Sequence, residues 1–213
     1  MSTTDPTDDP ELTGALRAGL PASAGDDWAA VRARFAARAV ADGLVDVAYE
    51  DHESPVGPLR IAATPRGIVR LVLPAEDPDA VLEAVAGAIS ARVVRVATPA
   101  LSAVRRELDE YFDGDRRAFD VPLDWALSRA FRREVLRATA LIPYGTTASY
   151  RRVATDAGSA NAVRAAGTAL ATNPLPILVP CHRVVRSDGG LGAYLGGVEM
   201  KERLLALEGA IAA

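Results

Sequence analysis

The sequence predicts two folded domains, an α+β domain followed by a mainly helical domain that contains a helix-turn-helix outline. Three observations indicate this arrangement. Short apolar runs between turn sequences predict strands in the first half, helical spacing of apolar residues dominates the second half, and two short helical patterns there flank a glycine. With 49% hydrophobic residues, a chain of 213 residues can bury one medium core or two small ones.

Residues 1–44 are expected to form an extension that carries one helix. The stretch before Asp27 is rich in Asp, Thr, Pro, Gly and Ala and lacks periodicity, so we expect a tail there with a short helical piece near residues 11–20. Asp27 is expected to cap a helix over residues 28–41, which has one apolar stripe. The role of this extension is open, and contact with an unidentified protein partner is one use that we consider.

The α+β domain is expected over residues 45–122. A turn with Pro65 early and Gly67 late separates two apolar runs, which is typical of an antiparallel meander. The spacing of Val81 and Val85 predicts a helix after the meander. The expected strands cover residues 45–49, 57–63, 67–73 and 92–97, and the expected helices cover residues 78–89 and 99–112.

The helical domain is expected over residues 123–213. A two-helix unit lies in its centre, with Thr147 or Ser149 as the N-cap of the first helix and a turn at Gly158. The pair Asn173-Pro174 should end the second helix, because proline cannot continue one. The expected helices cover residues 128–141, a short stretch that includes Tyr150, residues 161–172 and residues 198–207.

The charge of the chain is unevenly distributed. Its formal net charge is -4, which disfavours a nucleic-acid partner, but residues 129–213 carry 11 basic and 6 acidic side chains. Ten of those eleven cations are Arg, the residue suited to phosphate and base contacts. A solvated basic face without a partner is the alternative interpretation.

Cysteine and histidine are scarce. One Cys and two His exclude an intramolecular disulfide and argue against a zinc cluster, so we expect no metal and a reducing, cytoplasmic location. No apolar stretch approaches the ~18 residues of a membrane span, and the N-terminal residues do not resemble a signal peptide. We therefore expect no membrane contact.

The single cysteine is directly followed by a histidine, at Cys181 and His182. An apolar run ends at Pro180 just before them, so we expect Cys181 to be held rigidly near a core. Neighbouring side chains of a strand point to opposite faces, so the pair can cooperate only if the backbone turns or if a water or third residue joins them. A buried, unreactive cysteine is the alternative.

Two further stretches are candidates for function. The second helix of the two-helix unit is rich in Ala, and Arg164 is the one long cation in its middle, so its smooth face suits close approach to a narrow groove of a duplex. Close packing against other helices explains the same composition. Residues 186–197 form a glycine-rich loop around Tyr194 that could be a pocket wall.

The run from Asn173 to Val185 resembles the active-site segment of the O6-alkylguanine-DNA alkyltransferases, also called methylated-DNA–protein-cysteine methyltransferases. The blocks Ser54–Leu59 and Leu108–Gly114 are similar to the N-terminal domain of that family, and the resemblance extends from about Ser54 to Gly209. It implies a ribonuclease-H-like α+β domain followed by a winged helix-turn-helix-like C-terminal domain.

The resemblance also implies roles for residues of this chain. Cys181 matches the alkyl acceptor, His182 matches the histidine that takes the thiol proton through a water, and Glu208 matches the carboxylate that orients the histidine. Asn173 matches the asparagine that braces the turn between the recognition helix and the active-site strand. Such a relay would generate the thiolate, which is a strong nucleophile, from the weakly nucleophilic thiol.

Another group of residues matches contacts to DNA or to the flipped base. Tyr150 matches the tyrosine that bonds the guanine and turns the nucleotide, and Arg164 matches the finger that fills the vacated stack. Val184 matches a main-chain base contact, and Tyr194 with its glycine loop matches the pocket wall. The DNA and base contacts are thus expected at Tyr150, Arg164, Val184, Gly192, Tyr194 and Gly196.

The implied function is direct reversal of DNA alkylation. O6-alkylguanine would leave the stack of double-stranded DNA through the minor groove, and the alkyl group would pass irreversibly to Cys181 without a cofactor. O4-alkylthymine is a second candidate lesion. Leu195 stands where some family members have a small polar residue, which leaves the adduct preference open. The alternatives are a DNA-binding protein that senses or recognises alkylation without repair, and a Cys-His hydrolase, which leaves the two-helix unit unexplained.

Overall fold

The computed structural model describes residues 24–212 and divides into two units, Met1–Asp42 and Gly43–Ala213, which we describe separately. The first unit contains α2 (Ala24–Ala41). The helix starts three residues before Asp27, so the prediction that Asp27 is its N-cap was wrong. An acidic residue is also favourable inside the first turn of a helix, where it faces the positive end of the helix dipole. The helical piece expected near residues 11–20 lies outside the described residues.

The second unit begins with a four-stranded sheet in the order β3-β2-β1-β4. Neighbouring strands β1 and β2 are antiparallel, as are β2 and β3, which confirms the expected meander, and β4 adds to the edge parallel to β1. The strands are β1 (Val47–His52), β2 (Leu59–Thr64), β3 (Gly67–Val72) and β4 (Val93–Arg95).

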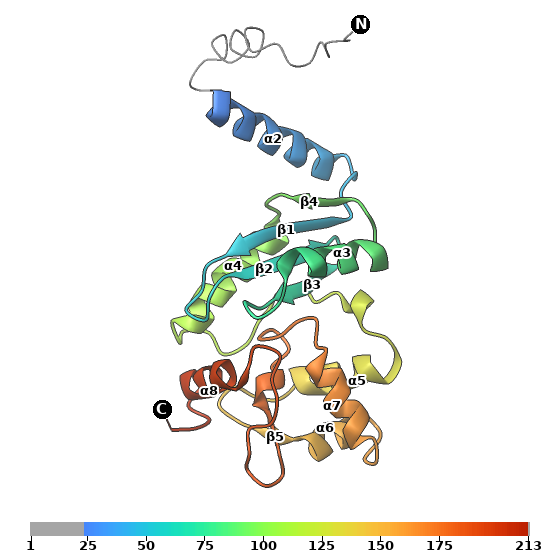
Figure 1. Ribbon diagram of the computed structural model, residues 1–213, viewed down its shortest axis with the longest axis vertical. Helices are drawn as coiled ribbons and strands as arrows, with labels where there is room; N and C mark the ends of the chain where they lie inside the picture. Colours follow the sequence, from blue (N-terminus) through green and yellow to red (C-terminus); the bar gives the residue numbers. More distant parts are fainter. Residues whose placement is uncertain (1–23, 213) are drawn as a thin grey trace, which may run out of the picture. The chain divides into compact units, whose positions relative to one another are not determined.

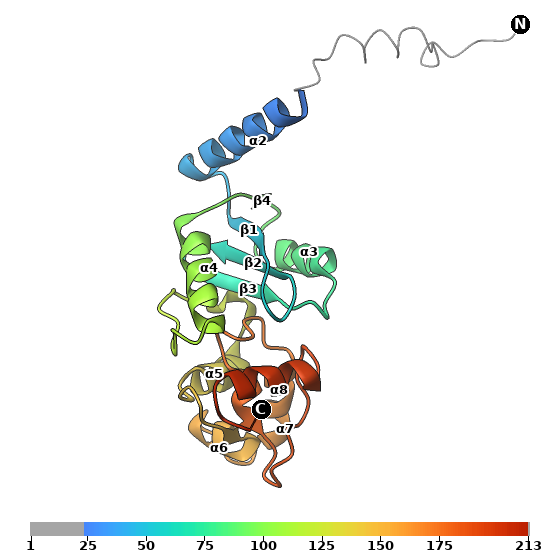
Figure 2. The same cartoon turned by 90° about the vertical axis from the view of Figure 1, so that its left-hand side faces the viewer.

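Two helices cover opposite faces of this sheet (Figure 2). They are α3 (Pro78–Ala88) and α4 (Pro99–Phe112), capped by Asp77 and Thr98 with proline as the first helical residue. Ile61 belongs to the core that α4 covers, whereas its neighbour Ala62 belongs to the core that α3 covers. Both faces of β3 are buried, and its sequence is apolar except for Arg70.

The C-terminal half is mainly helical (Figure 1). Ser149 caps α6 by accepting a hydrogen bond from the N–H of Arg152 at 3.1 Å, and Gly158 adopts a φ of +87° in the turn before α7. The expected two-helix unit is therefore present. The elements are η1 (Trp125–Leu127), α5 (Ala130–Ala140), β5 (Ala148–Ser149), α6 (Tyr150–Asp156), α7 (Val163–Ala171), η2 (Cys181–Arg183), β6 (Val184–Val185) and α8 (Val198–Leu207).

A short parallel pairing of β5 with β6 brings distant segments together. Ala148 pairs with Val184 and Ser149 with Val185. Tyr150 directly follows β5 and Cys181–Arg183 directly precede β6, so this pairing places the start of α6 beside the Cys-His segment.

The segment between α7 and η2 is a buried turn and not the strand that the resemblance implied. Residues 176–178 form a turn, and Ile177 has a φ of +71°, which is an outlier for a β-branched residue. The apolar run is nevertheless buried as expected, because Leu175 and Val179 are fully enclosed. Side-chain hydrogen bonds from Asn173 take the place of a strand ladder here.

Candidate active site

Cys181 lines a cavity of about 440 Å³ in the C-terminal half. The thiol-bearing residue is 5% exposed. Helices α6 and α7 and the glycine-rich loop supply the other walls, so residues from four separate parts of the chain converge on the cysteine. The lining residues are Tyr150, Gly167, Leu170, Ala171, Cys181, Ala193, Tyr194 and Leu195.

Asn173 holds the cysteine and the turn before it. Its amide nitrogen Nδ2 donates to the carbonyl oxygen of Val179 at 2.9 Å and to Sγ of Cys181 at 3.1 Å, and its Oδ1 accepts from the N–H of Leu175 at 3.0 Å. The side chain is fully buried. The expected bracing contact is present, and the bond to sulfur adds a donor that favours the thiolate.

His182 follows Cys181 in η2, where the backbone turns. Its Nε2 lies 2.8 Å from Oε1 of Glu208, and both side chains are fully buried. Its Nδ1 is buried without a hydrogen-bond partner among residues 24–212. The imidazole therefore does not bond the Cys181 sulfur directly, so a bridging group such as a water is needed to join them.

Glu208 receives four donors besides His182. Arg183 donates through Nε to Oε2 at 2.8 Å and through Nη2 to Oε1 at 2.9 Å, the Tyr111 hydroxyl donates to Oε1 at 2.7 Å, and the N–H of Gly145 donates to Oε2 at 3.4 Å. Burial alone would raise the pKa of Glu208, but the bonds from His182 and Arg183 outweigh it and lower the pKa to about 2. Glu208 is therefore an anion at neutral pH.

Arg183 and Tyr111 were not expected at this site. Arg183 directly follows Cys181 and His182 in an otherwise apolar, buried segment. A buried arginine needs an anionic partner, so its presence in such a segment indicates a carboxylate nearby. Tyr111 lies on α4, 97 positions before Glu208, and nothing in its local sequence indicates the contact. Only the packing of α4 against the C-terminal half creates it.

The electrostatics favour a neutral Cys181 and a neutral His182 in the resting protein. Burial raises the pKa of the Cys181 thiol to about 11, although the bond from Asn173 and the charge of Lys201 act in the opposite direction. Burial lowers the pKa of His182 despite the neighbouring Glu208. Because Glu208 is an acceptor only, we infer that Nε2 carries the imidazole proton and that Nδ1 is the free base.

Lys201 is a further buried residue near the site that was not expected from the sequence. Its Nζ on α8 donates to the carbonyl oxygen of Val184 at 2.6 Å and to that of Leu191. Burial lowers its pKa to about 8. The N–H of Val184 bonds the carbonyl of Cys181, so both main-chain polar groups of Val184 already make internal bonds, and Val184 is not among the residues that line the cavity.

Tyr150 and Tyr194 face the cavity from two sides. The Tyr194 ring stands edge-on to His182, with 6.2 Å between ring centroids, and its buried hydroxyl has no partner among residues 24–212. Gly192 has a φ of +71°, and a Cβ there would lie 2.9 Å from the Tyr150 hydroxyl. A Cβ at Gly196 would meet Met200, and Tyr194 at 3.0 Å, so both glycines permit close packing of the loop.

Arg164 is exposed on α7 and does not line the cavity. Gly167 and Ala171, which line the cavity, follow Arg164 by three and seven residues. These are helical spacings, so all three residues lie on the same face of α7. The Arg164 side chain makes no ion pair or hydrogen bond within residues 24–212. It is free to contact a ligand in front of the cavity.

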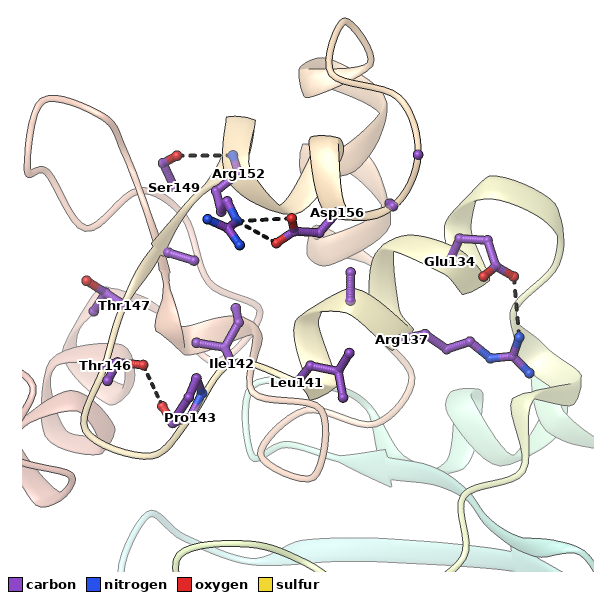
Figure 3. Close-up of a pocket in the computed structure, with 14 residues that line it drawn as sticks. Glu134, Arg137, Leu141, Ile142, Pro143, Thr146, Thr147, Ser149, Arg152 and Asp156 are labelled. Atoms are coloured by element: carbon purple, nitrogen blue, oxygen red, sulfur yellow. Dashed lines mark hydrogen bonds and ion pairs between the residues drawn. The ribbon is translucent and has the colours of Figure 1, made fainter.

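A larger cavity of about 920 Å³ lies between the end of α5, β5 and α6 (Figure 3). The charged side chains on its walls neutralise one another, because Arg152 pairs with Asp156 at 2.8 Å and Arg137 bonds Glu134 at 3.5 Å. It contains no cysteine, histidine or lysine. We therefore assign the chemistry to the smaller cavity, which contains Cys181.

The described part of the chain, residues 24–212, offers neither a cluster of metal ligands nor a membrane-spanning helix. Within that range no three His, Cys, Asp or Glu side chains are grouped so that they could hold a metal ion. No helix there is long and apolar enough to cross a membrane.

Comparison with known proteins gives the family. Family models for the DNA binding domain and the ribonuclease-like domain of 6-O-methylguanine DNA methyltransferase match residues 130–210 and 47–125. The constitutive methylated-DNA–protein-cysteine methyltransferase of Bacillus subtilis strain 168 is 39% identical over 161 residues, which cover 75% of this chain and 94% of that protein. This chain belongs to the methylated-DNA–protein-cysteine methyltransferase family.

Solved structures related to this methyltransferase have the same fold. The Mycobacterium tuberculosis O6-methylguanine methyltransferase gives a TM-score of 0.63 at 34% identity, over 78% of this chain and 95% of that one. Mycobacterium tuberculosis OGT in complex with DNA gives 0.64 at 34% identity, over 76% and 93%. The expected ribonuclease-like and DNA-binding domains are thus confirmed, whereas residues 1–46 lie outside both family models.

Proposed function

We propose that this protein removes alkyl groups from O6 of guanine in double-stranded DNA by transferring them irreversibly to Cys181. One observation carries the proposal. The only cysteine of the chain lines a cavity beside α7 of the two-helix unit, and the buried His182–Glu208 pair lies directly behind it. A base that enters the cavity would therefore meet a nucleophile with a proton acceptor at hand.

The proposed transfer is a direct displacement at the alkyl carbon. The thiol proton passes through a water to Nδ1 of His182, and Glu208 stabilises the imidazolium that forms. The thiolate then attacks the alkyl carbon, a bond from sulfur to carbon forms, the bond from carbon to O6 breaks, and its electron pair goes to O6. The guanine takes up one proton, so the net change moves the thiol proton to guanine and the alkyl group to sulfur.

No further reagent is required, because the lesion itself donates the alkyl group. The thioether product does not revert, so each molecule acts once. The resting thiol, whose pKa is about 11, is mostly protonated at neutral pH, so the reaction depends on the relay. Burial of the unused thiol protects it from unrelated electrophiles.

We propose that the damaged nucleotide leaves the stack through the minor groove. Exposed residues of α7 are small apart from Arg164, which suits close approach of the helix to the backbone. Arg164 would fill the vacated position, and Tyr150 and Tyr194 would enclose the base. The C-terminal domain would then work as a winged helix-turn-helix, with the β5–β6 pair and the loop over residues 186–197 as the wing.

The proposed domain boundaries are residues 45–122 for the ribonuclease-like domain and 123–213 for the DNA-binding and alkyl-accepting domain. Residues 1–44 would be an extension available to a protein partner. A reduced cysteine is essential to the reaction, which supports a cytoplasmic location.

The proposal is tested by mixing the pure protein with an excess of duplex that contains O6-methylguanine and recording the intact mass and the modified peptide. A gain of ~14 Da on Cys181 that stops at one equivalent is expected from a thiolate acceptor. Cys181→Ala should show no gain and keep its affinity for the duplex. A wild-type protein that binds the lesion selectively and gains no mass would instead be a sensor of alkylation.

A further inference from the structure

We propose that Arg70 of the ribonuclease-like domain is a positioning residue for alkyl transfer, because its guanidinium fixes the Asn173–Pro174 backbone from which the Cys181 thiol is held. This inference rests on the proposed function and adds to it a specific residue of the other domain. Arg70 lies on β3 and is buried, with 8% of its surface exposed.

The guanidinium reaches across to the turn after α7. Its Nη1 donates to the carbonyl oxygens of Pro174 at 3.1 Å and Asn173 at 3.5 Å, besides that of its neighbour Leu71 at 3.1 Å. The N–H of Leu71 also donates to the Pro174 carbonyl at 2.9 Å. The ribonuclease-like domain therefore holds the main-chain carbonyl groups of both Asn173 and Pro174.

A second arginine, Arg132, holds the end of α7 just before this turn. The last carbonyls of a helix lack partners within it, and α7 has no basic residue in its own last turn. Arg132 of α5 bonds the carbonyl of Thr172, so three successive carbonyls accept from Arg132 and Arg70. Arg132 thus caps α7 at its C-cap residue, and Arg70 holds the two residues that follow the helix.

The side chain of Asn173 links this backbone to the thiol. Its Nδ2 donates to Sγ of Cys181 at 3.1 Å, and its position depends on where the turn is held. Arg70 is itself held by an ion pair with Glu76, whose Oε2 accepts from the N–H of Leu73 at 3.0 Å. The chain of contacts runs from Glu76 through Arg70 and Asn173 to Cys181.

Three variants separate this role from a merely structural one. Arg70→Met removes the contacts with the carbonyls, and Arg70→Lys keeps a cation that can reach one carbonyl. Arg60→Met on β2 is the matched control, because the Arg60 guanidinium bonds Asp51 and Asp79 and lies outside this chain of contacts. Each is compared with wild type at a temperature well below its own unfolding midpoint. The probes are a duplex with O6-methylguanine and, without DNA, iodoacetamide, which can alkylate sulfur only at Cys181 among cysteines.

We expect Arg70→Met to slow methyl transfer by about 10-fold to 100-fold, the size of effect that small misplacement of a reacting group produces. Its iodoacetamide reaction should shift to higher pH, because the donor to sulfur is misplaced. Arg60→Met should stay within about threefold of wild type, and Arg70→Lys should recover part of the rate. In an Asn173→Ala background, Arg70→Met should have no further effect.

Contrary results are equally clear. If Arg70→Met slows transfer no more than Arg60→Met does, or if its effect adds fully to that of Asn173→Ala, Arg70 does not act through Asn173. Failure of wild type to gain a methyl group would overturn the proposed function instead, and the iodoacetamide profiles would still decide the role of Arg70.

Discussion

Nε2 of His182 and Oε1 of Glu208 lie 2.8 Å apart with neither side chain exposed to solvent. The same carboxylate also receives a two-point contact from Arg183 and a hydroxyl from Tyr111 of the other domain. It is therefore held in one position as an anion, and it fixes which imidazole nitrogen remains a base. In the proposed function, this buried cluster supports the reactivity of Cys181.

Replacing Glu208 by Gln should slow transfer by about 10²-fold or more, since the neutral amide neither fixes the imidazole tautomer nor stabilises the imidazolium. It should also destabilise the fold by about 3–5 kcal/mol, because Arg183 stays buried without its anion. Transfer rates and urea unfolding measure both effects. Glu202→Gln on the exposed side of α8 is the matched control and should change neither. Normal transfer by Glu208→Gln would exclude the relay.

The same carboxylate predicts a dependence of stability on pH. The pKa of Glu208 is about 2 in the folded protein and 4.5 in the reference state, so folding binds fewer protons at this site. Its contribution, about 3 kcal/mol, is present above pH ~4.5 and is lost as the pH falls toward 2. Urea unfolding at pH 7, 5 and 3 should show the stability gap between wild type and Glu208→Gln shrinking with acid. A constant gap would contradict this.

Removing the donor from Asn173 should make the thiol less acidic. The pKa of Cys181 is already raised to about 11 by burial, and the Asn173 bond lowers it. Asn173→Ala should therefore move the pH profile of Cys181 labelling by iodoacetamide further upward and slow labelling at pH 8. Thr172→Ala, at the exposed neighbouring position, is the control. An unchanged profile would mean that the bond to sulfur has no effect on the thiol.

Two glycines of the same loop provide a matched pair. Gly192 and Gly189 both have a positive φ, of +71° and +87°, so alanine is strained equally at each. Only at Gly192 would the new Cβ meet the Tyr150 hydroxyl, at 2.9 Å, whereas nothing lies within 4 Å at Gly189. Gly192→Ala should therefore slow transfer by about tenfold, and Gly189→Ala should cost only about 1 kcal/mol of stability. Equal transfer rates for the two variants would show that Tyr150 is not displaced.

Arg164→Ala should weaken both DNA binding and transfer, because it removes the one long exposed cation on this face of α7. Loss of a phosphate contact should also reduce the slope of log K against log salt concentration by about one, because one counterion fewer is released on binding. Arg106→Ala on α4, where the arginine is exposed and 3.6 Å from Glu110, is the control. Fluorescence anisotropy over a salt series measures both. Identical salt slopes for wild type and Arg164→Ala would show that this residue does not contact DNA.

Local sequence was a reliable guide to the elements. Short apolar runs on either side of the turn with Pro65 and Gly67 predicted the strands of the meander, and the final helix was predicted at the observed bounds of α8. Local rules failed at two places. An aspartate such as Asp27 is favourable both as an N-cap and in the first turn of a helix, so it does not fix where the helix starts. The apolar run before Cys181 fits a strand as well as a buried turn that is held by the side chain of Asn173.

What the sequence alone determined was the set of secondary-structure elements and, through a short run of residues around Cys181, the family and its chemistry. Such information is local, because propensity and motif spacing act over a few residues. The surroundings of that cysteine, in contrast, come from packing between distant segments. The contacts of Tyr111 with Glu208 and of Arg70 with Pro174 join residues about 100 positions apart, and such contacts exist only after the two domains pack.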